Sequence, residues 1–284
     1  MKILKTYLQV FIFFSSLITL FSCSKKSPDT GASNNSPVTY PPEVVPYKLT
    51  WSDEFNTDGL PDTTKWGYDV GGDGWGNNEL EYYTNAGSGN ARVLNGNLVI
   101  EARKEKYNGR NYTSARLLTK NKAQWTYGKF EIRAKIPRGI GTWPAIWLLS
   151  ANEPLHWPDD GELDIMEEVG FNPNVIYGTA HNKLYNGANG LQKGGNTLIA
   201  DAQDSFHVYA IEWTEKKVTW SVDSVDYFSY SDPGMAGAWP YNNDFFMILN
   251  IAVGGNWGGT HGIDDTIFPQ QMLIDYVRIY QRKK

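Results

Sequence analysis

Cysteine, histidine and excess positive charge are all scarce in this chain. Its 284 residues include one cysteine and four histidines. A single cysteine excludes an intramolecular disulfide. The histidines show none of the short-spaced pairing with Cys or His that marks a zinc site, so no metal or other cofactor is expected in the chemistry. A net charge of −5 without any basic stripe argues against nucleic acid as a partner.

Internal repeats, sustained helical periodicity and long apolar runs are missing as well. No repeat occurs at solenoid spacing, and no nucleophile elbow supports a Ser-His-Asp triad. The apolar run from about Val10 to Phe21 is too short and wrongly flanked for a membrane span. Because it follows a basic start, it is typical of an export signal instead.

The only cysteine, Cys23, stands directly after this run. The sequence Leu20-Phe21-Ser22-Cys23 resembles a bacterial lipobox, in which the cysteine is acylated and becomes the mature N-terminus, although Phe21 departs from the commonest pattern. We therefore expect residues 1–22 to be a lipoprotein signal peptide and Cys23 to be the lipid attachment site. The protein would then be exported and anchored to a bacterial membrane. The alternative is ordinary secretion with a free terminal thiol.

Two regions of different composition follow. Residues 23–46 are rich in Ser, Pro, Asn and Gly and predict a flexible tether that cannot bury a core. Residues 47–284 suit one large all-β domain. Polar and apolar residues alternate strictly over residues 129–136, and residues 217–222 turn at Asp223-Ser224 into a second strand. Further strand-like runs cover residues 97–101, 175–180, 205–213 and 245–253. Many strands with turn punctuation predict a two-sheet β-sandwich.

The segment at residues 161–170, GELDIMEEVG, is the strongest candidate for chemistry. Side chains alternate between the faces of a strand. Glu162 and Asp164 therefore share one face, and Leu163 and Ile165 share the other, which we interpret as buried. Crowded carboxylates raise the proton affinity of at least one of them, which suits acid and nucleophile chemistry at a glycosidic bond. The alternative is an edge strand with a solvated acidic face.

Regular alternation creates a conflict at the end of this segment. It places Glu167 on the buried face, where an unpaired carboxylate is strongly unfavourable. A one-residue bulge near Met166 would return Glu167 to the face of Glu162. Without a bulge, Glu168 would take that place. Spacing alone leaves both possibilities open.

The string Glu162-x-Asp164-x-x-Glu167 resembles the active-site signature of glycoside hydrolase family 16, in the bulged form of its laminarinases. Residues 74–83 (GWGNNELEYY), 142–149 (TWPAIWLL) and 274–280 (IDYVRIY) also resemble segments of that family. The matches occur in the expected order over roughly residues 47–282, which makes the signal specific. The resemblance implies that Glu162 is the nucleophile and Glu167 the acid/base, while Asp164 orients and tunes the pair.

The resemblance also implies a fold and an activity. The fold would be a concanavalin A-like β-jelly roll whose concave sheet forms an open cleft, where a polymer can be cut internally. The activity would be retaining endo-hydrolysis of β-1,3 linkages in laminarin-type β-glucan, by a monomer. One rival is a family 16 enzyme for mixed-linkage glucan, agar or carrageenan. Another is a non-catalytic glucan-binding protein, although such relatives typically lose the carboxylates that are present here.

Aromatic residues are abundant, with 11 Trp and 17 Tyr. Flat aromatic rings stack on the C–H faces of sugars. Trp143 and Trp147 share a strand face with Ala145, whereas the branched aliphatic Ile146 takes the opposite, core-like face. We therefore expect this Trp pair to line the cleft. The resemblance adds five further substrate-binding candidates: Asn78, Glu79, Arg116, His181 and Trp257.

A structural calcium site is a further implication. By alternation, Asp275 shares the core face with Val277, and a buried Asp needs a partner. The resemblance implies that Asp275 binds calcium together with Glu54 and Gly96 near the start of the domain, through carboxylate and carbonyl oxygens. The alternative is a hydrogen-bonded structural Asp.

Overall fold

The protein's structure, a computed structural model, describes residues 45–282. The predicted signal peptide, Cys23 and nearly all of the predicted tether lie outside the described residues. Within residues 45–282 the helices are two single turns, η1 (Gly187–Asn189) and η2 (Asp265–Ile267). None of the described helices has the length and apolar character needed to cross a membrane. The prediction of an all-β domain is confirmed.

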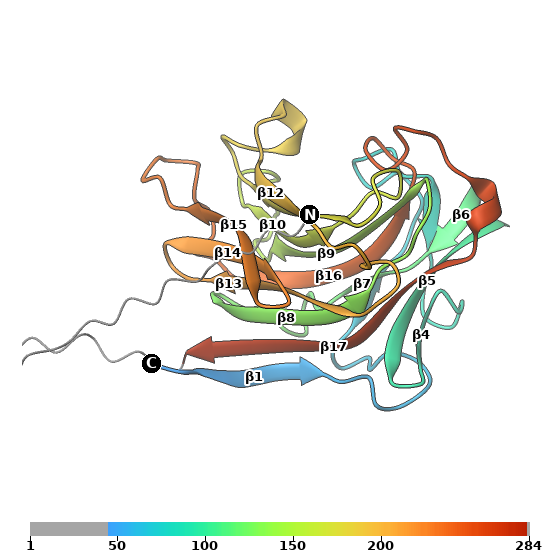
Figure 1. The fold of residues 1–284 in the computed structure, drawn as a ribbon, viewed down its shortest axis with the longest axis horizontal. Helices are drawn as coiled ribbons and strands as arrows, with labels where there is room; N and C mark the ends of the chain where they lie inside the picture. The colour runs from blue at the N-terminus through green and yellow to red at the C-terminus, as the bar shows by residue number, and fades with distance from the viewer. Residues whose placement is uncertain (1–44, 283–284) are drawn as a thin grey trace, which may run out of the picture. The chain divides into compact units, whose positions relative to one another are not determined.

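Two largely antiparallel sheets form this domain, one stacked on the other (Figure 1). The ten-stranded one, here called the outer sheet, has the order β15-β14-β13-β8-β17-β5-β6-β3, with β1 beside β17 and β4 beside β5. Its strands are β1 (Tyr47–Asp53), β3 (Glu81–Tyr83), β4 (Ala91–Leu94), β5 (Asn97–Tyr107), β6 (Arg110–Ser114), β8 (Gly128–Lys135), β13 (His207–Trp213), β14 (Lys217–Val222), β15 (Val225–Ser231) and β17 (Gln270–Arg282).

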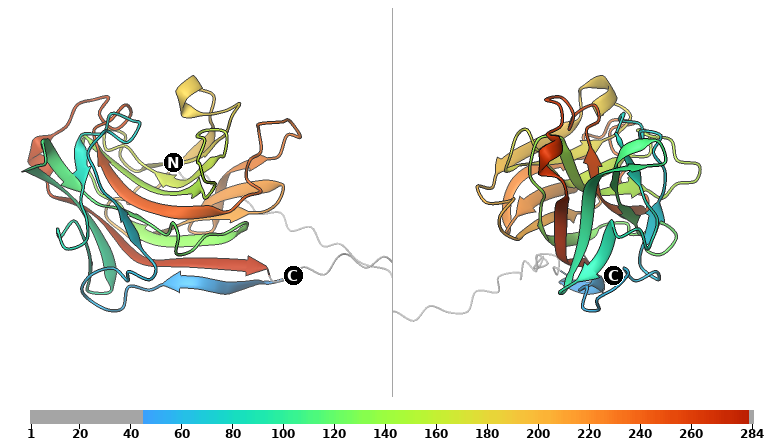
Figure 2. Two further views of the ribbon diagram at one scale, coloured as in Figure 1. Left: turned by 180° about the vertical axis from the view of Figure 1, so that it is seen from behind. Right: turned by 90° about the vertical axis from the view of Figure 1, so that its right-hand side faces the viewer.

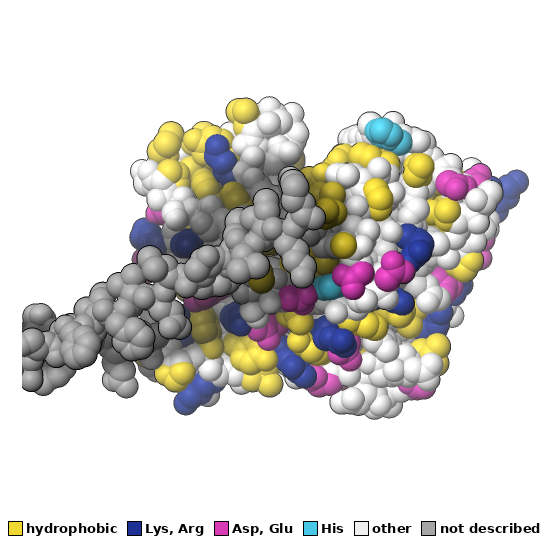
Figure 3. Space-filling view, viewed as in Figure 1, with side chains coloured by type: hydrophobic (Ala, Val, Ile, Leu, Met, Phe, Trp, Pro, Cys, Tyr) yellow, Lys and Arg dark blue, Asp and Glu magenta, His cyan; other side chains and the backbone are white. Residues whose placement is uncertain are grey.

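The seven-stranded sheet, here called the cleft sheet, has the order β12-β11-β10-β9-β16-β7-β2. Its strands are β2 (Gly67–Asp69), β7 (Arg116–Leu118), β9 (Thr142–Ser150), β10 (Glu162–Glu167), β11 (Val175–His181), β12 (Lys193–Leu198) and β16 (Phe245–Val253). Both sheets curve in the same sense, and the cleft sheet lies on the inside of the curve (Figure 2). The space-filling view shows the rim above it as two raised parts with a hollow between them (Figure 3). The predicted concave sandwich is therefore present.

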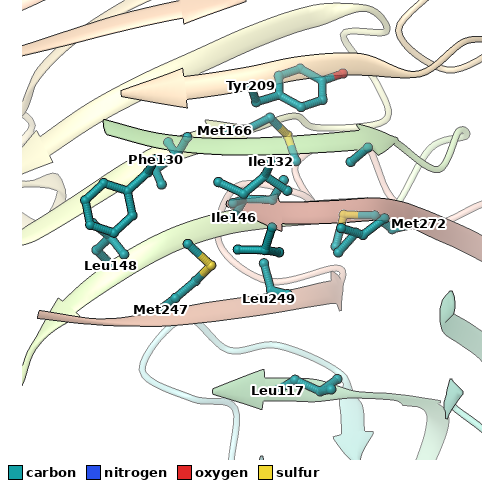
Figure 4. Packing of buried hydrophobic residues seen from close by; sticks show 14 of the residues in the cluster. Leu117, Phe130, Ile132, Ile146, Leu148, Met166, Tyr209, Met247, Leu249 and Met272 are labelled. Carbon is teal, nitrogen blue, oxygen red and sulfur yellow. The ribbon is translucent and has the colours of Figure 1, made fainter. Parts of the chain in front are cut away.

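The hydrophobic core fills the space between the two sheets. Figure 4 shows side chains of β9 and β16 meeting those of β8, β13 and β17. Most of these side chains are completely buried, including Ile146 and Leu249 of the cleft sheet and Phe130 of the outer sheet. Burial of such side chains contributes about 1.5–3 kcal/mol each. The packing fixes the cleft sheet in place, and its other face is left free for function.

Strand alternation predicted the regular strands well. Burial alternates along the whole of β8, as expected for residues 129–136. The hairpin of β14 and β15 turns at Asp223 and Ser224, which have φ angles of 50° and 67°. Positive φ at both central residues matches the right-handed twist of the flanking strands.

Alternation failed on β17. Its register with β8 shifts between Ile274 and Tyr276. Because of this irregularity Asp275 leaves the core face that Val277 occupies, and its side chain is 37% exposed. The expectation of a buried Asp275 was wrong for that reason.

Candidate active site

Strand β10 contains the bulge on which the acid/base assignment depends. Its pairing with β9 and β11 is regular up to Asp164 and shifts before Met166 and Glu167. Ile165 and Met166 are both buried in the core, whereas Glu162 and Glu167 are half-buried. An extra residue therefore returns Glu167 to the concave face with Glu162. The predicted bulge is confirmed.

Glu168 turns into the protein instead. Its side chain is completely buried. One carboxylate oxygen, Oε1, accepts hydrogen bonds from the backbone N–H of Asn174 (2.8 Å) and from Nε2 of Gln203 (2.7 Å). Burial raises the pKa of Glu168 to about 7. A carboxyl group enclosed in this way has no access to a polymer in the cleft.

The Glu162 carboxylate accepts one hydrogen bond and lies near one imidazole. The indole Nε1 of Trp157 donates to Oε2 at 3.0 Å, and Nε2 of His181 lies 3.7 Å from Oε1. Burial and the nearby charge of Asp164 raise the pKa of Glu162 to about 7. The charge of His181 and the hydrogen bond from Trp157 act in the opposite direction and favour the ionised form, which a nucleophile requires.

His181 connects Glu162 to Asp164. Its Nε2 lies 3.1 Å from Oδ2 of Asp164, and the backbone N–H of Gly187 donates to its Nδ1 at 3.0 Å. Burial lowers the pKa of His181, but the hydrogen bond and charge of Asp164 outweigh it and raise the pKa to about 9. The Gly187 amide favours the neutral ring with its proton on Nε2. In either form, Nε2 faces Oδ2 of Asp164.

The ligating atoms of Glu162, Asp164 and His181 lie within 4.8 Å of one another. That spacing could hold a cation. The indole N–H of Trp157 already donates to Glu162, and Nε2 of His181 forms a close ion pair with Asp164, so both carboxylates have a partner within the protein.

Glu167 has the environment of a proton donor. The indole Nε1 of Trp143 donates to its Oε1 at 3.0 Å. Burial, followed by the charge of Asp164, raises the pKa of Glu167 well above its ordinary value. A carboxyl group that stays protonated near neutral pH can act as a general acid.

The Trp pair predicted from strand parity does face the concave side. Trp143 and Trp147 are half-buried, while the intervening Ile146 is completely buried. Trp257 meets Trp143 edge-on, with ring centroids 5.6 Å apart, and meets Tyr177 in the same way at 5.0 Å. These rings form an aromatic wall next to Glu167.

Arg116 lies beneath that surface. Its side chain is sandwiched between Trp75 and Trp147, 4.8 Å from each ring centroid, and pairs with Asp69 at 2.9 Å. The residue is only 9% exposed. The structure therefore places Arg116 as a support for the tryptophans, and the contact with sugar that the resemblance implies stays a prediction.

Glu79 is a second support. It is 4% exposed and accepts a hydrogen bond from the Tyr83 hydroxyl at 2.9 Å. Asn250 donates to that hydroxyl at 3.0 Å and accepts from Nε1 of Trp147 at 2.8 Å. This chain of bonds ties Trp147 to the buried carboxylate. The neighbouring Asn78 is exposed, as a sugar ligand must be, and lines a hollow of about 370 Å³.

Sequence reasoning missed several of these residues. Trp157, Trp75, Tyr177 and Asn250 all touch the site, and none was singled out. The available signal for Trp157 was its place five residues before Glu162, but only the fold of the loop at residues 151–161 brings its N–H to the carboxylate.

Two of the three residues predicted to bind calcium, Glu54 and Asp275, form ion pairs with arginines. Arg278 makes two hydrogen bonds to Glu54, at 3.1 and 2.8 Å, and lowers its pKa. Nη1 of Arg133 lies 2.6 Å from Oδ2 of Asp275. Gly96 lies in the turn between β4 and β5 with a φ of 74°. A guanidinium beside each carboxylate does not fit a divalent cation, and calcium binding here stays a prediction for melting curves with and without chelator.

The concave sheet and its pair of differently tuned carboxylates define the class of the protein as a glycoside hydrolase. Comparison with known proteins identifies the family. The family model "Glycosyl hydrolases family 16" matches residues 78–278. The chain belongs to this family.

Individual relatives agree with that assignment. A beta-glucanase from Rhodothermus marinus is 54% identical over 244 residues, which cover 83% of this chain and 85% of the relative. The X-ray structure of the laminarinase from Rhodothermus marinus aligns with a TM-score of 0.82 at 53% identity, over 84% of this chain and 98% of that one. The structure of SCLam, a non-specific endo-beta-1,3(4)-glucanase, aligns with a TM-score of 0.80 at 45% identity, over 86% and 95%.

Proposed function

We propose that this protein is a retaining endo-1,3-β-glucanase that cuts laminarin-type β-glucan within the polymer. The observation that carries the proposal is the bulge in β10, which brings Glu167 to the same concave face as Glu162. The similarity to laminarinases supports the substrate class. An open concave face lets a long polymer lie across the carboxylates.

The first step forms a covalent bond to the enzyme. The ionised Glu162 attacks the anomeric carbon, while Glu167 gives its proton to the oxygen of the leaving chain. The C–O bond to the leaving chain breaks, and a glycosyl ester of Glu162 forms. Asp164, which is paired with His181, lies close to both carboxyl groups. Its charge raises the pKa of Glu162 and of Glu167.

The second step reverses the proton's direction. Glu167 takes a proton from water, whose oxygen attacks the anomeric carbon and releases Glu162. The charge of Glu162 is one cause of the raised pKa of Glu167. That charge disappears when the ester forms, so the pKa of Glu167 falls when a base is needed.

Three tryptophans on the concave face hold the sugars. Trp143, Trp147 and Trp257 offer ring surfaces next to the carboxylates. Because the N–H of Trp143 bonds to Glu167, the surface that binds the sugar also positions the acid/base.

Linkage preference is tested by a reducing-sugar assay on laminarin, lichenan, agarose and carrageenan in parallel. We expect the highest rate on laminarin, with internal cuts that release a ladder of oligosaccharides. Lichenan is the informative second substrate, because the relative SCLam is described as non-specific between 1,3 and 1,3(4) linkages. Release only from agarose or carrageenan would support the rival family 16 activities. Binding without release would support a glucan-binding protein.

We further propose that the protein is an exported lipoprotein that acts as a monomer. The support for export and for a lipid on Cys23 is the basic start, the short apolar run and the lipobox-like sequence before the only cysteine.

A further inference from the structure

The bulge in β10 is bonded to the opposite sheet. Trp220 of β14 is completely buried in the core, and its indole Nε1 donates a 2.7 Å hydrogen bond to the backbone carbonyl of Asp164. Asp164 is the last residue before the register of β10 shifts. Since β14 belongs to the outer sheet, this bond crosses the core and does not belong to a strand ladder.

The strand beside the bulge leaves space for Trp220. Gly178 of β11 lies between Thr179, which pairs with Asp164, and Tyr177, which pairs with Glu167. A Cβ atom on Gly178 would lie 2.3 Å from Cδ1 of Trp220 and 2.5 Å from the Tyr227 hydroxyl. The contact between Trp220 and the bulge therefore depends on a residue without a side chain at this position.

The bond favours the bulged strand over a regular one. A bulge disrupts the local ladder, and a buried carbonyl that loses its partner costs about 1–3 kcal/mol. Trp220 supplies a donor at that carbonyl. In a regular strand the faces after Asp164 would exchange, so Glu168 would turn toward the cleft and Glu167 toward the core.

We propose that Trp220 is a positioning residue, which holds the bulge and thereby directs Glu167 into the cleft. Trp220 does not touch substrate; it acts through the backbone of the strand that carries the acid/base. The inference rests on the proposed function, because it explains how the proposed acid/base reaches its place.

A pair of matched tryptophan variants tests this role. Trp220→Phe removes the N–H and retains an aromatic ring. Trp213→Phe is the control, because Trp213 is also completely buried in the outer sheet and donates to a backbone carbonyl, that of Tyr241 at 3.0 Å. Both variants should have lower melting temperatures. Only Trp220→Phe should lower kcat on laminarin, by ~10²-fold with KM little changed, because a displaced catalytic group costs about that much.

A chemical signature separates mispositioning from general damage. If Glu167 is displaced, azide should increase turnover of an activated aryl β-glycoside by Trp220→Phe, since azide replaces the water that Glu167 can no longer activate. Trp213→Phe should not respond to azide. All rates are compared per folded protein, below the lowest melting temperature.

Glycine variants give a second route if Trp220→Phe does not fold. Gly178→Ala should displace Trp220 and produce the same loss of kcat and the same azide response. Gly72→Ala is its control, because the new Cβ would lie 2.9 Å from Tyr82 and 3.0 Å from Arg110, and none of its closest contacts is with Trp220. The positioning role is overturned if Trp220→Phe or Gly178→Ala, once folded, matches its control in kcat and azide response. The proposed function fails separately, if the unaltered protein releases no sugar from laminarin.

Discussion

At the scale of single residues, the site depends on which N–H group faces which carboxylate. Trp157 donates to Glu162 and Trp143 donates to Glu167. Strand spacing was enough to place Glu162 and Asp164 on one face, and the family resemblance selected Glu167. Neither could predict the donor to Glu162, since Trp157 reaches the carboxylate only through the conformation of its loop.

The charge on Glu162 is tested by Glu162→Gln. This change retains the shape of the side chain and removes the attacking oxygen's charge. We expect kcat on laminarin to fall by at least ~10³-fold, equivalent to about 4 kcal/mol in the barrier, with little change in melting temperature. Binding of laminarin should survive. Near-normal turnover by the purified variant would refute the assignment of the nucleophile.

The two indole donors should control opposite limbs of the pH profile. The hydrogen bond from Trp157 lowers the pKa of Glu162, so Trp157→Phe should raise it and move the acid limb of kcat/KM to higher pH. The bond from Trp143 lowers the pKa of Glu167, so Trp143→Phe should move the basic limb to higher pH. Initial rates on laminarin across the pH range measure both limbs. Profiles that superimpose on that of the unaltered protein would contradict the assigned contacts.

At the scale of elements, alternation succeeded on regular strands and failed at irregular ones. It predicted the faces of β8 and β14, whose burial alternates from one end to the other. It misplaced Asp275 and left Glu167 and Glu168 undecided, because β17 and β10 both shift register. At the irregularity in β10, the carbonyl of Asp164 accepts a hydrogen bond from Trp220, which lies 56 residues away in the chain. Local periodicity carries no information about such a contact.

The buried Glu168 should make the stability depend on pH. Its pKa is raised from 4.5 to about 7, so its stabilising, protonated form is complete below 4.5 and is lost as the pH rises through about 7. Glu168→Gln mimics the protonated form. Relative to the unaltered protein, it should gain about 1–3 kcal/mol between pH 5 and pH 8. Chemical denaturation at the two pH values measures this gain, and an equal difference at both would rule out the raised pKa.

At the scale of the whole molecule, the strand pattern predicted the two-sheet sandwich, and the family resemblance predicted its concave face with the carboxylates on it. Strand signals without helical periodicity were sufficient for the fold class. The prediction was weaker where long-range packing decides exposure. Arg116 and Glu79 proved to be buried supports of Trp147, because segments distant in sequence close over them.

The predicted lipid anchor at Cys23 belongs to the whole protein and lies outside the residues that the structure describes. Cys23→Ala should abolish acylation and move the protein from the membrane fraction to the soluble fraction, while laminarin hydrolysis continues. Fractionation of cells that express each form, followed by detection of the protein, measures the change. Membrane association that is equal in both forms would contradict attachment through Cys23.

The central claim is that the bulge makes Glu167, and not Glu168, the acid/base. The most direct test is azide rescue of Glu167→Ala on an activated aryl β-glycoside, with Glu168→Ala as the matched control. Such a substrate needs little acid assistance, and azide needs no base, so turnover of Glu167→Ala should recover and yield a β-glycosyl azide, the configuration that retention requires. Glu168→Ala should remain active on laminarin and show no rescue. Rescue of Glu168→Ala, with Glu167→Ala still active on laminarin, would contradict the account.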